Sequence, residues 1–325
     1  MKNRFILIFS VLLLASTTCY SDNSWKTCEG ISSQVSFSAM QKEGGLYASG
    51  TRMWREGQAF HSEPALYTSE DGSTWQEAIY PKCSMLSSYN VLFFAGKRIL
   101  AAGRKGETQL DWVGAVCYSD DNGNTWKQSE GIPENISINS IYASGSLVIA
   151  LGQRQWREGY MMYSEPKAYV SLDMGASWNN YVTITDQLSS ISSAIDSNNR
   201  ILVTGRVGQA QMNWVGGVFY TDNQGSQWNQ STGIDSDVSI TAFAKYKDML
   251  VALGQKQWME NYQMHSESKA YVSKDNGQTW ETWIEIPSQL TSISAVYLEG
   301  NKIFLTGRIG EAGLDWVGGI LYTNL

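Results

Sequence analysis

Short runs of strand-forming residues, separated by turn residues, recur throughout the chain. In one unit, residues 190–196 (SISSAID) predict an inner strand and residues 200–207 (RILVTGRV) predict a second strand. Residues 213–221 (NWVGGVFYT) predict a third strand, and Trp228 begins a fourth. Outside the N-terminal segment, no ten-residue stretch has convincing helical periodicity. Four short strands in each unit predict the blade of a β-propeller, which is an all-β fold.

A tryptophan recurs with a period of about fifty residues, which is typical of a repeat architecture. These residues are Trp25, Trp75, Trp126, Trp178, Trp228 and Trp280, at spacings of 50, 51, 52, 50 and 52. Five of them end a similar octet. Three octets are full matches: Ser119–Trp126 (SDDNGNTW), Ser171–Trp178 (SLDMGASW) and Ser273–Trp280 (SKDNGQTW). Two are near matches: Thr68–Trp75 (TSEDGSTW), with Glu70 in the Asp position, and Thr221–Trp228 (TDNQGSQW), with Asn223 and Gln227 as substitutes.

The octet has the chemistry of a tight turn. An Asp or Asn side chain can accept backbone N–H bonds within its own turn, and Gly supplies a positive φ. The terminal Trp opens the next strand and buries a large ring. The octet resembles the Asp-box, S-x-D-x-G-x-T-W, of sialidase-like β-propellers, which is also called the BNR repeat. The resemblance implies that each box links the third and fourth strands of a blade and has a structural role.

The two ends of the chain complete one another. Residues 23–31 (NSWKTCEGI) are similar to the fourth-strand segment 124–132 (NTWKQSEGI), and residues 318–325 (GGILYTNL) match a third strand. We therefore expect six blades, the last closed by the N-terminal strand, which removes a free sheet edge. The expected domains are a signal peptide at 1–21 and a single propeller at 22–325, with approximate blades 32–81, 82–132, 133–183, 184–234, 235–286, and 287–325 plus 22–31.

Two types of blade alternate, so that a two-blade unit of about 102 residues occurs three times. Odd blades contain GTRMWREG (50–57), GQRQWREG (152–159) and GQKQWMEN (254–261). Even blades contain GRKGETQLDWVGA (103–115), GRVGQAQMNWVGG (205–217) and GRIGEAGLDWVGG (307–319). The pattern predicts an approximate threefold axis along the channel. All six segments connect second and third strands, so we expect them on the face opposite the Asp-boxes, where loops on a rigid scaffold can carry recognition.

Aromatic and charged residues recur at equal positions in these loops. Trp rings stack on the apolar faces of sugars, and Arg and Glu satisfy hydroxyl groups, so the pattern indicates small-ligand binding. The candidate ligand-binding residues are Trp54, Glu56, Trp156, Glu158, Trp258, Glu260, Arg104, Arg206 and Arg308. The same loops contain Arg52, Arg154, Lys256, Glu63, Glu165 and Glu267 in odd blades, and Asp111, Asn213, Asp315, Trp112, Trp214 and Trp316 in even blades. In the alternative interpretation, the Trp rings fill space between blades and the Arg side chains are struts.

Composition narrows the class of partner. The chain has 24 Lys and Arg against 31 Asp and Glu, a formal net charge of −7, which argues against a nucleic-acid partner. With 2 His in the chain, we expect neither a His-rich metal centre nor a cofactor. His61 and His265 share one repeat position with Tyr163, which indicates a surface aromatic position rather than a catalytic base.

The N-terminal segment predicts export. Lys2 and Arg4 precede an apolar run from Phe5 to Ala15, which is shorter than a membrane span and is followed by small residues. We expect cleavage before Asp22, no membrane span and a location outside the cytoplasm, either secreted or periplasmic.

Three cysteines remain after cleavage: Cys28, Cys83 and Cys117. Export permits a disulfide, and Cys28 with Cys83 is the first pair to consider. The alternative is that the three cysteines are small buried hydrophobic residues.

Three functions fit the sequence. Near-equal copies of a loop site favour a multivalent binding module, with glycans as the first choice of ligand, because repeated sites give avidity. The resemblance also suggests a sialidase-like glycoside hydrolase, a family that uses an arginine triad, a Tyr–Glu nucleophile pair, an Asp acid and an early Arg-Ile-Pro motif. Arg-Ile-Pro does not occur and no blade breaks the repeat, so we assign no catalytic residue. The third function is a protein-binding scaffold, as in the Asp-box propellers of sorting receptors and photosystem assembly factors.

Overall fold

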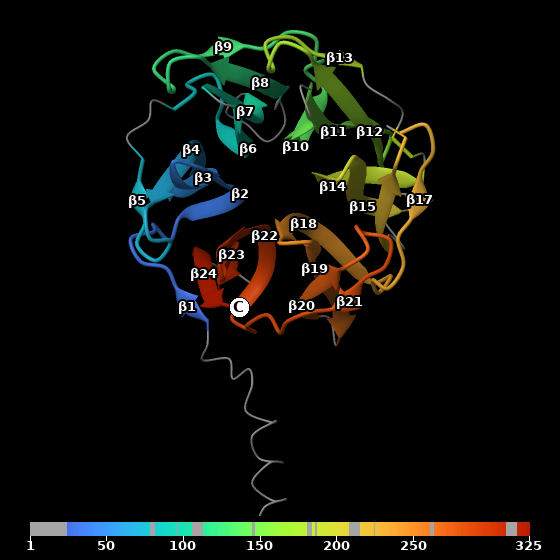
Figure 1. The fold of residues 1–325 in the computed structure, drawn as a ribbon. Coiled ribbons are helices and arrows are strands. Elements are labelled where there is room, and N and C mark those ends of the chain that lie inside the picture. Colours follow the sequence, from blue (N-terminus) through green and yellow to red (C-terminus); the bar gives the residue numbers. More distant parts are fainter. Residues whose placement is uncertain are drawn as a thin grey trace, which may run out of the picture.

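Six four-stranded antiparallel sheets stand around a central axis as the blades of a propeller (Figure 1). The first strand of each blade lies nearest the axis and the fourth lies outermost. The expected all-β, six-bladed fold is confirmed. The computed structural model describes residues 25–325 except 79–81, 96, 106–112, 145–146, 181–183, 186, 208–214, 224, 261–262 and 310–316, so that the expected signal peptide lies outside the described residues.

Blades 1 to 3 follow one another along the chain. Blade 1 contains β2 (Val35–Glu43), β3 (Gly45–Glu56), β4 (Ala59–Ser69) and β5 (Gln76–Glu77). Blade 2 contains β6 (Ser88–Ala95), β7 (Arg98–Lys105), β8 (Val113–Ser119) and β9 (Lys127–Gln128). Blade 3 contains β10 (Ile136–Ser144), β11 (Leu147–Glu158), β12 (Met161–Ser171) and β13 (Asn179–Asn180).

Blades 4 to 6 complete the ring. Blade 4 contains β14 (Leu188–Ser197), β15 (Arg200–Val207), β16 (Val215–Thr221) and β17 (Asn229–Gln230). Blade 5 contains β18 (Val238–Tyr246), β19 (Met249–Glu260), β20 (Gln263–Ser273) and β21 (Glu281–Thr282). Blade 6 contains β22 (Leu290–Glu299), β23 (Lys302–Ile309), β24 (Val317–Asn324) and β1 (Lys26–Thr27).

The N-terminal strand closes the last blade, as the sequence predicts. β1 pairs with β24 through Lys26 opposite Tyr322 and Thr27 opposite Leu321. The backbone N–H of Cys28 then donates to the carbonyl of Ile320 at 2.9 Å. The part of the chain that the structure describes contains no helix with the length and hydrophobicity needed to cross a bilayer.

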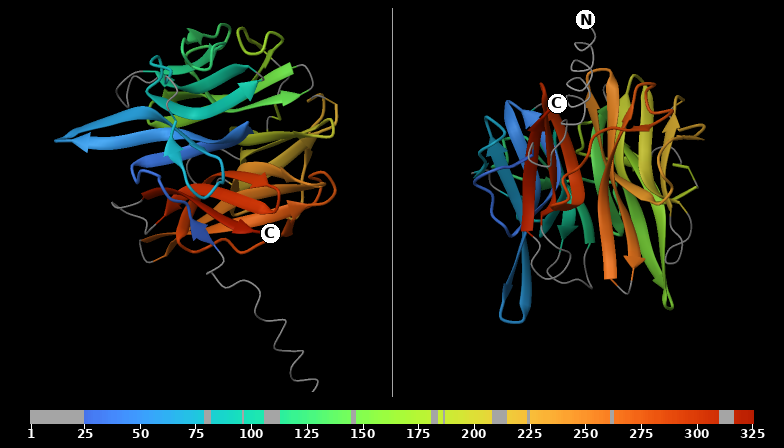
Figure 2. Two further views of the ribbon diagram at one scale, coloured as in Figure 1. Left: turned by 60° about the vertical axis from the view of Figure 1, so that its left-hand side comes forward. Right: turned by 90° about the horizontal axis from the view of Figure 1, so that it is seen from below.

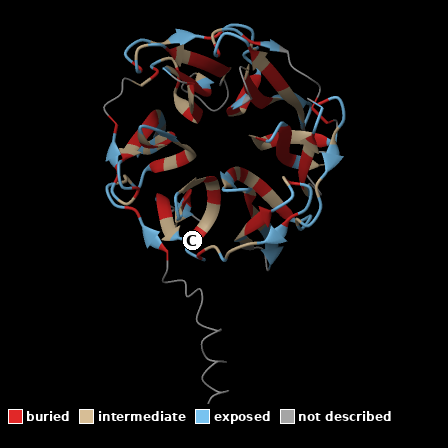
Figure 3. Ribbon diagram, viewed as in Figure 1, coloured by how far each residue is buried: buried red, intermediate tan, exposed pale blue. Residues whose placement is uncertain are grey.

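The hydrophobic core is divided among the six interfaces between neighbouring blades. Between blades 6 and 1, for example, Phe37 and Trp75 pack with Phe304 of β23. Figure 3 shows buried residues within the strands and exposed residues in the short outer strands and turns. Since burial of one large apolar side chain contributes about 1.5–3 kcal/mol, each interface holds its two blades together.

A ring of β-bulges surrounds the channel. Each inner strand contributes one residue to this ring, and β14 and β22 have a second bulge, at Ser189 and Thr291. The residues of the ring are Ser38, Asn90, Asn139, Ser192, Thr241 and Ser294. Ser38, Asn90, Asn139 and Thr241 each donate a side-chain hydrogen bond of 2.9–3.1 Å to a backbone carbonyl of the next inner strand. Each bulge leaves one residue outside the regular pairing of its strand and changes the direction of its side chain. The side chain can then link adjacent blades.

The Asp-boxes form the turns between third and fourth strands, as the resemblance implies. In blade 2, Asp121 accepts hydrogen bonds from the Thr125 backbone at 2.8 Å and the Thr125 hydroxyl at 2.7 Å, and Ser119 Oγ accepts from the Gly123 N–H. In blade 3, burial opposes ionisation of Asp173, but hydrogen bonds from the Ser177 side chain and backbone lower its pKa to about 2.

The sequence assignment of the first box is wrong in one respect. Asp71, not Glu70, accepts the two backbone hydrogen bonds of the turn, from Ser73 and Thr74 at 2.8 Å each. Ser69 Oγ accepts from the N–H of Gly72, the role that Ser119 has in blade 2. This box is therefore one residue shorter between its Ser and its Gly, and it begins at Ser69.

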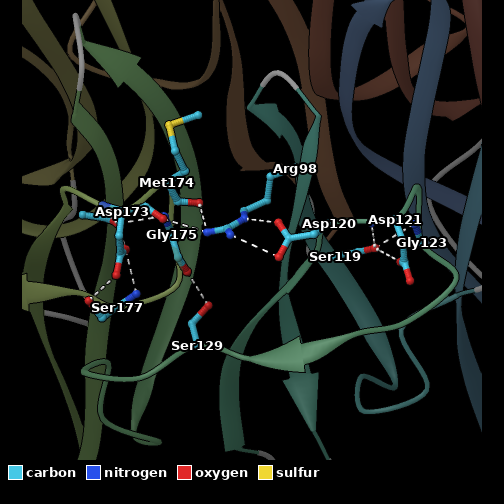
Figure 4. A network of polar contacts seen from close by, with 11 residues as sticks. Arg98, Ser119, Asp120, Asp121, Gly123, Ser129, Asp173, Met174, Gly175 and Ser177 are labelled. Carbon is cyan, nitrogen blue, oxygen red and sulfur yellow. Dashed lines mark hydrogen bonds and ion pairs between the residues drawn. The ribbon is translucent and has the colours of Figure 1, made fainter.

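A basic residue at the start of the second strand joins each even blade to the Asp-box of the next odd blade. Arg98 forms an ion pair with Asp120 at 2.6 Å and donates to the carbonyl of Asp173 at 2.7 Å (Figure 4). Arg200 and Lys302 make the equivalent bonds, to the carbonyls of Asn276 at 3.0 Å and Asp71 at 3.2 Å. Sequence analysis did not identify these residues, because their partners lie in another blade.

The repeated Trp-Val-Gly segment of the even blades makes a second contact with the next odd blade. The N–H of Gly114 donates to the carbonyl of Glu134 at 2.8 Å. A Cβ on Gly114 would lie 1.8 Å from the carbonyl oxygen of Ile136, so only glycine permits this approach. Gly216 and Gly318 have the same position. Each even blade is therefore joined to the odd blade that follows it by an additional close backbone contact.

The structure contradicts the pairing of Cys28 with Cys83, because these two buried, free thiols lie in different hydrophobic clusters. Cys28 lies between blades 6 and 1, where its Sγ donates to the carbonyl of Gly72 at 3.2 Å. Cys83 lies instead between blades 1 and 2, in one hydrophobic cluster with Cys117. The position of Cys28 is that of Ser129 in blade 2, whose Oγ donates to Gly175.

Candidate binding site on the hairpin face

In the odd blades the second and third strands continue past the four-stranded sheet as a two-stranded ribbon. β3 pairs with β2 as far as Arg52, and its pairing with β4 continues to Glu56. β11–β12 and β19–β20 continue in the same way to Glu158 and Glu260. The three ribbons project from one side of the ring (Figure 2). Because third strands run from these tips to the box turns, this side, here named the hairpin face, is opposite the Asp-boxes, as predicted.

Each ribbon contains a pair of stacked rings. The pairs are Trp54 with His61, Trp156 with Tyr163, and Trp258 with His265, at centroid distances of 5.3, 5.6 and 5.4 Å and interplanar angles of 19°, 18° and 19°. Trp258 is 37% exposed, and Trp54 and Trp156 are half-buried. These rings do not belong to the buried clusters, so the interpretation in which they fill the space between blades does not apply to them.

Strand order determines which side of each indole is covered. β4 lies outside β3, so His61 covers the side of Trp54 that faces away from the axis. Beyond Arg52, no described strand pairs with β3 on its axial side. No described strand therefore covers the side of Trp54 that faces the axis, and in blade 3 the guanidinium group of Arg154 lies over the Trp156 ring.

Charged side chains at the base of the ribbons neutralise one another. Arg52 bonds to Glu63 and Glu77 at 2.7 Å each, and Lys82 lies 3.1 Å from Glu77. The hydrogen bond from Arg52 lowers the pKa of Glu77. The equivalent pairs in the other odd blades are Lys256 with Asp237, Glu165 with Lys167 and Glu267 with Lys269, at 2.6–2.7 Å. These residues are struts that hold the ribbons.

The second set of acids lies nearer the tips and is exposed. Trp156 Nε1 donates to Glu158 at 3.0 Å, and Arg154 lies 5.2 Å from the centre of the Trp156 ring. In blade 1, Glu56 lies 3.9 Å from Nε2 of His61. Glu260 is exposed at the equivalent position of blade 5. Each acid is thus beside a Trp ring and can accept hydrogen bonds from a ligand hydroxyl.

The three even-blade arginines face these ribbons. Leu100 and Ala102 pack between blades 2 and 3. Arg104 lies on the same face of β7 as these two residues, because alternate residues of a strand share a face. Ala150 of β11 packs in the same cluster, and Trp156 lies on the same face of β11 as Ala150. The interface between blades 2 and 3 therefore brings Arg104 to the same side as Trp156 and Glu158.

The other two alternate interfaces have the same arrangement. Leu202 of β15 and Ala252 of β19 pack together between blades 4 and 5. Arg206 is on the same face of β15 as Leu202, and Trp258 and Glu260 are on the same face of β19 as Ala252. Phe304 of β23 and Ala48 of β3 pack together between blades 6 and 1. Arg308 is on the same face of β23 as Phe304, and Trp54 and Glu56 are on the same face of β3 as Ala48. The nine candidate residues thus divide among three interfaces, each between an even blade and the odd blade that follows it, and these groups are here named the composite sites. The further candidates Asp111, Trp112, Asn213, Trp214, Asp315 and Trp316 lie outside the described residues.

The channel is lined by neutral side chains. A cavity of about 290 Å³ lies between the inner strands. Its lining includes hydroxyl and amide groups of the bulge ring and apolar residues such as Met40 and Phe243. None of the described lining residues has a carboxyl or basic group. Within the described ranges, no cluster of three or more His, Cys, Asp and Glu side chains could hold a metal ion.

Comparison with known proteins agrees with the motif and the fold. Residues 166–307 match the family model described as Sortilin, neurotensin receptor 3 (Sortilin-Vps10). A comparison with curated protein sequences gives no match. The chain folds as a six-bladed β-propeller whose turns between third and fourth strands are Asp-boxes, and residues 166–307 are similar to the Sortilin family model.

Solved structures share the fold of this Asp-box propeller at low sequence identity. A Dyadobacter fermentans protein of unknown function is 11% identical, with a TM-score of 0.66, 93% of this chain covered and 100% of the other. A Fusarium graminearum α-L-arabinofuranosidase is 13% identical, with a TM-score of 0.62 and coverage of 93% and 98%. Trypanosoma rangeli sialidase is 14% identical, with a TM-score of 0.56, and the match covers 94% of this propeller but 58% of the sialidase.

Proposed function

We propose that this Asp-box propeller is an exported, multivalent binding module for glycans. The observation that carries the proposal is the threefold recurrence, on one face, of a partly exposed indole at an interface that also carries an Arg and a Glu. The arabinofuranosidase and the sialidase of the same fold act on sugars, which supports the ligand class.

The chemistry of each composite site fits a sugar ring. An indole offers a flat apolar surface to the C–H face of a pyranose or furanose, while Arg donates to hydroxyl oxygens and Glu accepts from hydroxyl hydrogens. One exposed aromatic contact gives modest affinity. Three sites on one rigid face can engage neighbouring glycan chains together, which raises the overall affinity without a new contact.

A glycan array tests the proposal. We expect the purified chain to bind a defined subset of immobilised oligosaccharides, and the triple variant Trp54→Ala, Trp156→Ala, Trp258→Ala to lose at least about 100-fold in apparent affinity. The matched control is the triple variant Met53→Ala, Gln155→Ala, Gln257→Ala, because these exposed residues lie on the opposite face of the same ribbons. The control should bind like the unaltered chain.

The same samples separate the alternatives. Absence of binding to every glycan, or equal binding by the Trp variant, rejects the proposal. A fluorogenic sialoside and an arabinofuranoside should not be turned over; turnover that Arg206→Ala abolishes would favour the glycoside hydrolase instead.

A protein-binding scaffold is the second candidate function. The match of residues 166–307 to the Sortilin family model favours it. We expect such a scaffold to bind none of the glycans on the array.

A further inference from the structure

Two thiols meet in the core between blades 1 and 2. Cys83 lies on the segment that leads into β6, and Cys117 lies on β8. Both side chains are 0% exposed and belong to one hydrophobic cluster. The two thiol groups interact, because each changes the pKa of the other. The third thiol, Cys28, packs in a different cluster, so the structure distinguishes one pair from the remaining cysteine.

Backbone hydrogen bonds hold both members of the pair. The N–H of Cys83 donates to the hydroxyl of Tyr89 at 3.0 Å, and its carbonyl accepts from Leu86 at 3.1 Å. Cys117 is in the middle of its sheet, opposite Ala101 of β7 and Gln128 of β9.

The two thiols are not equivalent. The hydrogen bond from Cys117 lowers the pKa of Cys83, and the same hydrogen bond together with burial raises the pKa of Cys117.

We propose that Cys83 and Cys117 form a disulfide when the folding chain meets a disulfide oxidant of an oxidising compartment, either a protein disulfide or oxidised glutathione. The Cys83 thiolate attacks one sulfur of the oxidant, which breaks that S–S bond and releases one thiol. Cys117 then loses its proton and attacks the Cys83 sulfur, which releases the second thiol. The two cysteines lose two electrons and two protons, and the oxidant gains both.

The bond has a consequence for the first ribbon. Lys82, next to Cys83, lies 3.4 Å from Glu63 and 3.1 Å from Glu77, which both bond to Arg52 at the base of the ribbon. A disulfide to β8 fixes the segment that carries Lys82. It therefore stabilises the network below Trp54 in blade 1.

Peptide mapping tests the proposal. The purified chain is refolded with reduced and oxidised glutathione, alkylated under denaturing conditions without reduction, and digested. We expect a linked peptide that joins Cys83 to Cys117, with Cys28 alkylated. Three alkylated cysteines, or a linkage that includes Cys28, would overturn the proposal.

Thermal unfolding provides a second readout. Reduction should lower the unfolding temperature of the oxidised chain by about 5 °C or more, because the bond closes a loop of about 35 residues. The matched control is Cys28→Ser, which places in blade 6 the residue that blade 2 has at Ser129. This variant should keep both the linked peptide and the thermal shift, and loss of either contradicts the assignment.

Discussion

Replacing Gly131 with Ala is expected to lower the free energy of unfolding by about 3 kcal/mol or more. Gly131 follows β9 and has a φ of +91°. A Cβ there would lie 2.0 Å from the carbonyl oxygen of Trp178. The neighbouring Glu130 bonds by both its N–H and its carbonyl to the Asp-box of blade 3, at 3.0 and 2.9 Å. The methyl group must push this segment away and break both bonds.

Gly159 provides the matched control for this prediction. Its φ is +61°, but a Cβ there would meet nothing within 4 Å. Gly159→Ala should therefore cost only the left-handed backbone penalty of about 1–2 kcal/mol. The measurement is the urea unfolding midpoint of both variants. Equal midpoints would show that the contact between an even blade and the next odd blade does not contribute as described.

The second large effect concerns the density of immobilised glycan. We expect a tenfold dilution of the surface to lower the apparent affinity of the unaltered chain by about 100-fold, because only one site then engages at a time. The double variant Trp54→Ala, Trp258→Ala retains one site, so it should bind weakly and equally at both densities. Surface plasmon resonance at two densities measures this. An unaltered chain that is insensitive to density would contradict multivalent binding.

Local turn chemistry made most of the fold predictable. The spacing of Trp75 to Trp280, the Gly of each box and the similarity of residues 23–31 to 124–132 are sufficient for six blades and their closure. The box assignment was wrong only at Asp71, because the number of residues within that turn decides which acid caps it.

Contacts between blades could not be predicted from one strand at a time. Arg98 bonds to a carbonyl 75 residues away, and Asn90 bonds to a strand of the next blade. The sequence does show that Arg98, Arg200 and Lys302 occupy one repeat position. The carbonyl groups to which they bond depend on how the blades pack in the ring. The same holds for the pairing of Cys83 with Cys117 rather than with Cys28.

The candidate residues were predicted as two separate sets of loops. The structure orients Arg104 and Trp156 toward one interface, because side chains of β7 and β11 face one another across it. The alternation that decides this is visible in the sequence only after the strands are assigned. The composite nature of each site is therefore a result of blade packing.

The number of binding sites in one chain tests the central claim most directly. A soluble, monovalent oligosaccharide selected from the array is titrated into the purified chain and followed by calorimetry. Three composite sites predict a stoichiometry near three for the unaltered chain and near two for Trp156→Ala. A stoichiometry of one, unaffected by Trp156→Ala, would place the ligand elsewhere and contradict the account.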